Sequence, residues 1–597
     1  MSDVATSDHA AGEDNTELKR VMGPKLLLLF IVGDILGTGV YALTGAVAGE
    51  VGGAAWAPFI AAFVVATITA FSYLELVTKY PKAGGAATFI HKAFGLHFLT
   101  FMVAFAVMCS GITSASTASN AFAGFLSDGL GLTWGPNQLL IAALAFMLVI
   151  ALINFRGVGE SVKANVVLTL VELSGLLLII FIGLYAVTQG KADFSRVMVF
   201  ESASDKNTFF AITMATSLAF FAMVGFEDSV NMAEETHEPS RIFPKVMLTG
   251  LGITGVIYVL VSITAVALVP VGDLTDPDKA SALTQVVAAG APGLPFDKIF
   301  PFIGMFAVAN SALINMLMAS RLVYGMARQE VLPPGLGVVH KSRQTPWAAI
   351  IFTTLISFGL ISYVVLDSES QVVALLGGTT SLLLLAVFTI VNIAVLVLRR
   401  DKVGREHFKA PTVLPIIGAI SCAFLVGPWA RSEEQQQQYE IAGILLGLGV
   451  LLWVVTWFIN RAVYAKKTYM RDPEHIDHDR APRGKRGGTG DPVPPPSLCV
   501  DVVPRDGALP YGNAGSIPHC RRAMQSLDVE RLHCRRAMQS LDVERLHCRR
   551  AMQSLDVETL HCRRAMRDRG LRGSRCRRSR RRRGCRSRRG GRRPRAG

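Results

Sequence analysis

The sequence predicts an all-α polytopic membrane protein with 12 transmembrane helices. Hydrophobic residues make up 51% of the 597 residues, and the mean hydropathy is +0.40. Both values are too high for a soluble protein that also contains 18% charged residues. The chain has twelve apolar runs long enough to cross a bilayer, and basic residues gather in alternate loops between them. We therefore expect the lipid bilayer to be the main environment of this chain.

Each transmembrane helix needs roughly 20 mostly apolar residues. The polar N-terminal residues 1–23 have no basic region leading to a small-residue cleavage site, so we expect an uncleaved first helix rather than a signal peptide. The twelve expected helices lie near residues 26–48, 54–78, 96–124, 137–154, 163–187, 208–231, 246–270, 299–323, 347–365, 371–398, 413–430 and 439–462.

The distribution of basic residues predicts the orientation of these helices. Fifteen lysines and arginines lie in the loops that follow the even-numbered helices, and six lie in the other loops. Loops rich in lysine and arginine stay on the cytoplasmic side of a membrane. We therefore expect a multi-pass protein of the cytoplasmic membrane with both termini in the cytoplasm.

The net charge of +15 comes from the C-terminal segment alone. Residues 464–597 hold 34 of the 60 basic residues and 14 of the 45 acidic residues, so the rest of the chain is net acidic. We therefore expect no nucleic-acid partner for the membrane part. The two cysteines of that part, Cys109 and Cys422, have no metal-ligand spacing, and we expect no metal or cofactor.

A 14-residue unit, HCRRAMQSLDVERL, fills residues 519–532 and recurs as far as residue 566. The copies lack the large apolar residues of a folded core, so residues 466–597 are expected to form a disordered basic cytoplasmic tail. This tail could bind anionic lipid or RNA by charge, or hold metal through its His-Cys pairs. A tandem duplication or an out-of-frame extension without function is the interpretation that we rank first.

Glycines interrupt the first and the sixth expected helices. The first contains Gly33, Gly37 and Gly39, and the sixth contains Gly225. Such glycines serve either close packing between helices or a break that frees backbone N–H groups to hold an anion. Because breaks at corresponding places in two halves of a transporter indicate its central site, the pair favours binding over packing.

Acidic residues also occur within the predicted helices, where charge is costly and indicates a functional site unless it pairs or reaches water. Glu75 lies near a helix end, so a structural pair or contact with water is expected there. Four other acids lie deeper in the apolar runs: Asp34, Glu172, Glu227 and Asp228.

Four motifs of the chain resemble those of the amino acid–polyamine–organocation superfamily of transporters. Gly37 to Tyr41 read GTGVY, and the stretch from Phe220 to Pro244 is similar to the family signature of the sixth helix and the loop after it. Residues 320–333 provide a third match, and residues 81–85 a weaker fourth. The resemblance covers residues 20–465.

The resemblance implies a leucine-transporter-like fold, in which two inverted repeats of five helices have discontinuous helices 1 and 6. The first repeat would cover about 24–190 and the second about 205–400, followed by two peripheral helices near 411–463. Together these elements would form a transporter domain of residues 24–465.

The resemblance also implies where a substrate would bind. The backbone of Gly37, Thr38 and Gly39 would take the substrate carboxylate, which suits the positive end of a half-helix. Gly225 would sit at the second break, and Phe221 would be an aromatic lid. The substrate ammonium would meet backbone carbonyls near Ile35, Phe221, Ala222 and Val224.

The coupling ion is expected to be a proton, with sodium left open. Proton-driven relatives often carry a lysine in the fifth helix, where this chain has Glu172. Because burial favours the neutral form of a carboxyl group, Glu172 is itself a candidate proton carrier. Glu227 and Asp228 are further candidates for coupling or gating. Asp34 has either a coupling role or a structural hydrogen bond.

The sequence therefore predicts a proton-coupled secondary transporter for an amino acid or related amine. An exchanger of polyamines, or of amino acids for amines, is an alternative. A membrane sensor that kept the fold without transport, and a membrane-anchored RNA-binding protein, are alternatives of other classes. The chain has no nucleophile, metal or nucleotide motif that would favour an enzyme. The exact substrate and the oligomeric state stay open.

Overall fold

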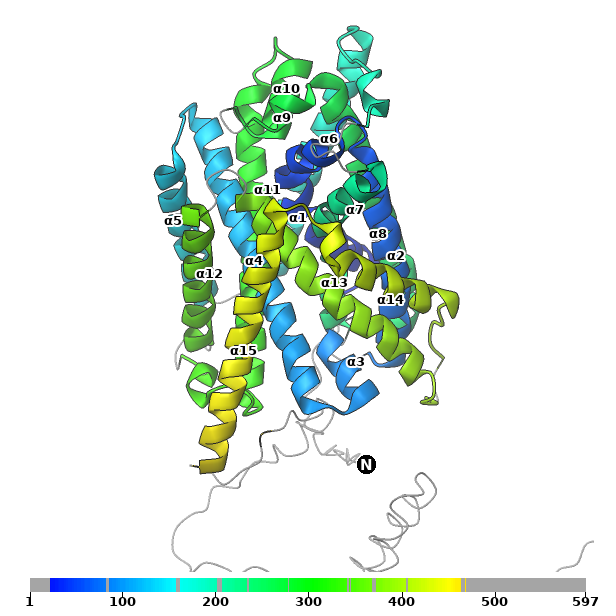
Figure 1. Cartoon of the computed structure of the whole chain (residues 1–597), viewed down its shortest axis with the longest axis vertical. Helices are drawn as coiled ribbons and strands as arrows, with labels where there is room; N and C mark the ends of the chain where they lie inside the picture. The colour runs from blue at the N-terminus through cyan, green and yellow to red at the C-terminus, as the bar shows by residue number, and fades with distance from the viewer. Residues whose placement is uncertain are drawn as a thin grey trace, which may run out of the picture. The chain divides into compact units, whose positions relative to one another are not determined.

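The computed structural model describes residues 22–462 and Thr468, with short internal gaps. The gaps are at 82–84, 157–160, 201–206, 234–235, 277–278, 341–342, 344, 368–371 and 404–405. The described part is a helical bundle, and the only β-structure in it is two isolated β-bridges (Figure 1). The expected tail, residues 466–597, lies outside it apart from Thr468, as does almost all of the expected N-terminal tail, residues 1–23.

The long helices follow the apolar runs of the sequence closely. In chain order they are α1 (Pro24–Val51), α2 (Trp56–Lys79), α4 (His97–Leu130), α5 (Pro136–Arg156), α6 (Ser161–Thr188), α7 (Thr208–Ala219), α8 (Pro239–Leu268), α11 (Phe296–Arg328), α12 (Trp347–Asp367), α13 (Val372–Leu398), α14 (Val413–Val426) and α15 (Gln437–Ala462). Proline residues begin α1 and α8, where a missing backbone N–H costs nothing.

Eleven helical segments of the described chain are long and apolar enough to cross a membrane. One of them joins α7 to two short 3₁₀ segments, η2 (Phe220–Met223) and η3 (Asp228–Met232). The eleventh of the twelve expected helices corresponds to α14, which is apolar but shorter, with 14 residues. The chain is therefore a multi-pass membrane protein with eleven candidate spans in its described part, and the twelfth expected span, at α14, stays a prediction.

Short helices that the apolar runs did not predict lie in the connections. They are α3 (Gly85–Phe94), α9 (Val271–Leu274) and α10 (Ala282–Gly290). Figure 1 shows α3 at one end of the bundle and α9 with α10 at the other. This placement agrees with the predicted alternation of loops, because α3 follows the second helix and α9 and α10 follow the seventh.

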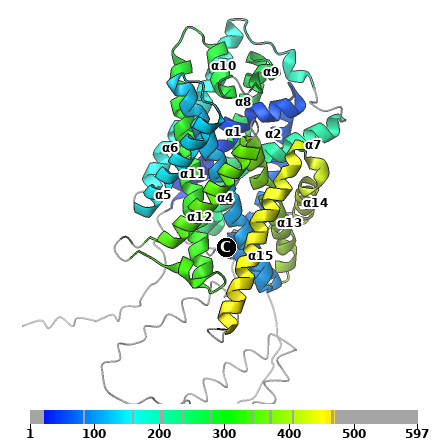
Figure 2. The ribbon, with the colours of Figure 1, turned by 60° about the vertical axis from the view of Figure 1, so that its left-hand side comes forward.

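The first helix runs through the interior of the bundle. It packs against α6, α7, α8 and α11, while α4 packs against α11 and α13 (Figures 1 and 2). Every residue from Ile35 to Tyr41 is buried. A helix surrounded by protein in this way can lose backbone hydrogen bonds without exposing them to lipid.

Polar side chains connect helices across the interior. The Ser72 hydroxyl of α2 donates to Asn392 of α13 at 2.6 Å, and the hydroxyls of Thr113 and Thr380 are 2.7 Å apart between α4 and α13. Hydrogen bonds of this kind contribute to helix association in a bilayer, where burial of apolar surface contributes little. They hold α13 against both neighbours.

A buried ion pair joins the end of α2 to the chain that follows α13. Arg399 donates from Nε and Nη2 to the two oxygens of Glu75, at 2.8 and 2.7 Å, and the backbone N–H of Ala410 donates to Glu75 at 2.9 Å. The carboxylate side chain is 3% exposed, and its hydrogen bonds raise the pKa of the Arg399 guanidinium. Glu75 is therefore a structural partner rather than a group that reaches water.

Candidate functional site

The first helix breaks where the sequence predicts. Within Pro24–Val51, Gly37 alone leaves the helical region, with φ 9° and ψ −144°. This change of direction removes the normal partners of nearby carbonyl and N–H groups. The second half of α1 therefore begins inside the bundle, with its N-terminus at Thr38 and Gly39.

The second break lies between α7 and η3. Helix α7 ends at Ala219, η2 continues to Met223, and the chain then leaves helical geometry until Asp228. Gly225 has φ 123°, a conformation that residues with side chains rarely adopt. Its backbone N–H donates to the Glu227 carboxylate at 2.9 Å, so this acid stabilises the turn itself.

The two breaks lie against each other. A Cβ atom added at Gly225 would be 2.8 Å from the carbonyl carbon of Asp34, and one added at Gly39 would overlap the backbone of Ala222. Gly33 has a different role, because its missing side chain makes room for Thr169 of α6. The glycines of the first helix therefore have both predicted roles, close packing and a break in the helix. Gly33 allows close packing, and Gly37 and Gly39 belong to the break.

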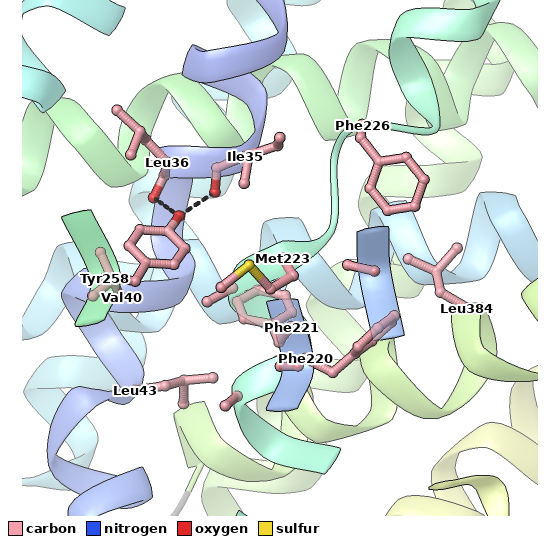
Figure 3. Packing of buried hydrophobic residues seen from close by; sticks show 14 of the residues in the cluster. Ile35, Leu36, Val40, Leu43, Phe220, Phe221, Met223, Phe226, Tyr258 and Leu384 are labelled. Carbon is pink, nitrogen blue, oxygen red and sulfur yellow. Dashed lines mark hydrogen bonds between the residues drawn. The ribbon is translucent and has the colours of Figure 1, made fainter. Parts of the chain in front are cut away.

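A tyrosine of α8 binds the carbonyl groups freed by the first break. The Tyr258 hydroxyl donates to the backbone oxygen of Ile35 at 2.5 Å and lies 3.1 Å from that of Leu36 (Figure 3). The Tyr258 side chain is fully buried and its ring packs against Phe59. Sequence reasoning missed this residue, because nothing in the α8 sequence marks a contact 223 positions away.

Four carboxyl groups surround the breaks. Glu172 of α6 is 0% exposed, and neither of its carboxyl oxygens has a hydrogen-bond partner in the described structure. The amide side chain of Asn310 lies close enough to interact with this carboxyl group. The charges of Glu172, Glu227 and Asp228 all act on Asp34, whose Oδ2 is also buried without a partner. The structure thus brings together the four acids that the sequence singled out.

A small cavity of about 50 Å³ adjoins the second break. It extends from Val224, Glu227 and Asp228 to Gly85 at the start of α3. Its other walls include Tyr73, Ser110, Asn231, Asn315 and Thr380. The cavity therefore lies between the breaks and the α3 end of the bundle, and its wall combines two carboxyl groups with amides and hydroxyls.

The opposite side of the breaks is closed by apolar packing. Phe221 is 5% exposed and belongs to the same buried cluster as Leu43 (Figure 3). Both side chains lie against Gly377 of α13, where an added Cβ would be 3.2 Å from Leu43 and 3.5 Å from Phe221. The Phe226 and Phe388 rings, by contrast, pack on Tyr73 of the cavity wall and so belong to the α3 side. Phe221 is thus placed as a barrier on the side away from α3.

The predicted binding residues gather at one place, although no ligand contact tests them. Ile35, Gly37, Thr38 and Gly39 form the first break, and Thr38 Oγ1 is buried without a partner. The predicted residues of the second break are Phe221, Ala222, Val224 and Gly225, of which Ala222 and Gly225 contact the first helix. Among the described residues, no group of three or more His, Cys, Asp or Glu side chains is arranged to hold a metal ion.

Comparisons with known proteins point the same way. The amino acid permease family model matches residues 24–455. A branched-chain amino acid permease of Bacillus subtilis is 27% identical over 70% of this chain and 90% of its own length. A methylthioribose transporter of the same organism is 25% identical, covering 77% and 96%. Cationic amino acid transporter 1 of Arabidopsis thaliana is 24% identical, covering 74% and 72%.

Proposed function

Because the chain belongs to the amino acid permease family, within the amino acid–polyamine–organocation superfamily, we propose that it is a secondary active transporter. Its substrate is an amino acid or a related amine, and its place is the cytoplasmic membrane, with both termini in the cytoplasm. The family and the relatives are described as permeases and transporters rather than enzymes.

The single observation that supports this proposal most strongly is the meeting of the two helix breaks. The backbone of Asp34 lies against Gly225, and Gly39 lies against the backbone of Ala222, so the two breaks share one small region. A protein that only anchored or sensed would gain nothing from breaking two buried helices at one point. A carrier needs such polar backbone at the middle of the bilayer.

The first break offers a site for the substrate carboxylate. The N–H groups of Thr38 and Gly39 begin the second half of α1, where the helix dipole adds a positive field. The Thr38 hydroxyl, buried and without a partner, can donate a further hydrogen bond. Binding of an anion here needs no basic side chain.

Proton coupling is assigned to Glu172, with Glu227 as second candidate. Keeping an unpaired carboxylate buried costs several kcal/mol, whereas the protonated group is tolerated. Within the described residues, Glu172 forms no ion pair that would stabilise its charged form. Binding and release of a proton at Glu172 would therefore change the free energy of burying this side chain during each transport cycle.

The asymmetry around the breaks supports a proposal of alternating access. The cavity lies on the α3 side, and Phe221, Leu43 and Gly377 close the other side. With α3 at the predicted cytoplasmic end, this arrangement faces inward. Transport to the other state requires Phe221 to leave α13 and the residues near Gly85 to approach η3.

Uptake by proteoliposomes tests the function directly. Labelled amino acids, putrescine and methylthioribose are offered with and without an inward proton gradient. We expect uptake of at least one amino acid or amine, accelerated by the gradient. Uptake that depends on substrate inside the vesicles instead would indicate an exchanger. No uptake and no thermal stabilisation by any compound would favour the sensor.

The role of Glu172 has its own test. Glu172→Gln removes the exchangeable proton and keeps the size of the side chain, so we expect substrate binding to persist while the proton gradient no longer accelerates uptake. Glu440→Gln, a change at an exposed acid in the first turn of α15, is the matched control and should leave the gradient effect intact. An unchanged gradient effect in Glu172→Gln would move the assignment to Glu227.

A further inference from the structure

Asp34 has no structural partner that explains its presence in α1. The residues on either side of it are buried, but Asp34 itself is partly exposed, although it lies well inside the helix. Its Oδ2 is buried and has no hydrogen-bond partner among the described residues. Within the described residues, no basic side chain forms an ion pair with this carboxyl group.

Two other side chains at this place are also unsatisfied. Thr38 is 2% exposed and Glu172 is 0% exposed, and the hydroxyl of the first and both oxygens of the second lack hydrogen bonds in the described structure. Buried polar atoms are paired in the great majority of cases, so the unsatisfied atoms of these side chains are available to a polar ligand. The ionised form of Asp34 only accepts hydrogen bonds, so a ligand for that form must donate them.

The backbone carbonyl expected to receive the substrate ammonium is already bonded. Tyr258 donates to the oxygen of Ile35, and its hydroxyl also lies within hydrogen-bond distance of the oxygen of Leu36 (Figure 3). Asp34, immediately before Ile35, keeps a free side-chain acceptor at Oδ2, and its backbone lies against Gly225, where the two breaks meet. The residue next to the meeting point of the breaks therefore carries a strong acceptor without a partner.

The local charge favours a cation at this position. Glu172, Glu227 and Asp228 act on Asp34, and none of the four forms an ion pair within the described part of the chain. A protonated amine would offset this negative charge and donate up to three hydrogen bonds. A charge-assisted bond of this kind is stronger than one to a neutral carbonyl.

We propose that the Asp34 carboxylate binds the ammonium group of the substrate. This inference rests on the proposed transport function and narrows its substrate class to ligands with a protonated amine. The ligand needs no carboxylate, so simple amines compete with amino acids at the same site. Asp34 then determines specificity, and Tyr258 holds the break in the shape that presents it.

Ligand binding to the full-length protein in detergent tests the inference. Labelled leucine, arginine and putrescine are the probes, and 4-methylpentanoate, which is leucine without its amino group, is the competitor. We expect wild type to bind at least one amine probe and to ignore 4-methylpentanoate. Asp34→Asn should weaken amine binding at least tenfold, which corresponds to about 1.4 kcal/mol.

Two further variants separate this role from a structural one. Asp34→Glu keeps the charge and should retain measurable amine binding, and Asp193→Asn, at an exposed acid between α6 and α7, should bind as wild type does. Folding is monitored by size-exclusion profile and by Tm.

The inference is overturned if Asp34→Asn binds the amines as tightly as wild type, or if 4-methylpentanoate competes with leucine as well as leucine itself does. Because the second comparison uses wild type alone, it stands even if a variant does not fold. If wild type binds none of the three probes and transports nothing in proteoliposomes, the proposed function fails as well. These results therefore distinguish the two failures.

Discussion

Removing Arg399 should destabilise the protein more than removing both members of its ion pair. The Glu75 side chain is 3% exposed and receives two hydrogen bonds from Arg399 and one from the backbone of Ala410. Arg399→Gln leaves a buried carboxylate with the Ala410 bond alone. Breaking a buried pair from one side costs about 3–5 kcal/mol, and the 15% exposure of Arg399 places our expectation near about 3 kcal/mol.

The Glu75 variant and the double variant should change the free energy of unfolding by different amounts. Glu75→Gln should cost about 1–2 kcal/mol, because Arg399 keeps its bonds to Thr412 and to the carbonyl of Ala410 and is closer to water. The double variant should be at least about 1 kcal/mol more stable than Arg399→Gln, because it contains no uncompensated carboxylate.

Equilibrium unfolding in mixed dodecylmaltoside–SDS micelles, followed by circular dichroism, measures these free energies. Arg196→Gln is the matched control: its ion pair with Asp193 is 40% and 43% exposed, and we expect a change within about 0.5 kcal/mol. A double variant as unstable as the sum of the two single variants would refute the reasoning, because it would show that Glu75 is not left unpaired by the loss of Arg399.

Three other perturbations have defined outcomes. Tyr258→Phe leaves the break carbonyls without their donor and should lower stability by about 1–3 kcal/mol in the same unfolding assay, whereas Tyr185→Phe, at an exposed ring, should not. Gly225→Ala strains a backbone at φ 123° and should abolish uptake. The control Gly359→Ala, at an open position, should leave uptake unchanged. Normal uptake by Gly225→Ala would show that the turn accepts a side chain without strain. Deletion of residues 475–597 should leave uptake intact, and its loss in correctly inserted protein would give the tail a function.

The long helices could be predicted because the bilayer fixes their length and apolar character. The short helix α10 could not, because nine residues in a connection carry no such signal. Helix α14 was expected to reach residue 430 but ends at Val426, where Gly427 and Pro428 stop regular helical geometry.

The sequence predicted which segments form the site, but it did not predict the contacts between them. Glycine spacing located both breaks, yet it could not separate Gly33, which packs on Thr169, from Gly39, which lies against the second break. The hydrogen bond of Tyr258 to Ile35 joins residues 223 positions apart, and a single sequence contains no information on such contacts. The partner of Glu75 was hidden for the same reason, because Arg399 lies 324 positions away.

If the acids around the breaks carry charge through a transport cycle, as proposed, we expect transport to depend on voltage. Asp34, Glu172, Glu227 and Asp228 lie together, and none of them forms an ion pair in the described residues. The net charge of the occupied carrier is then determined by the protons and ammonium groups that it holds. Each charge that crosses the membrane exchanges about 2.3 kcal/mol per 100 mV with the field. Currents recorded at different potentials would therefore count the protons bound to this group of acids in each step of the cycle.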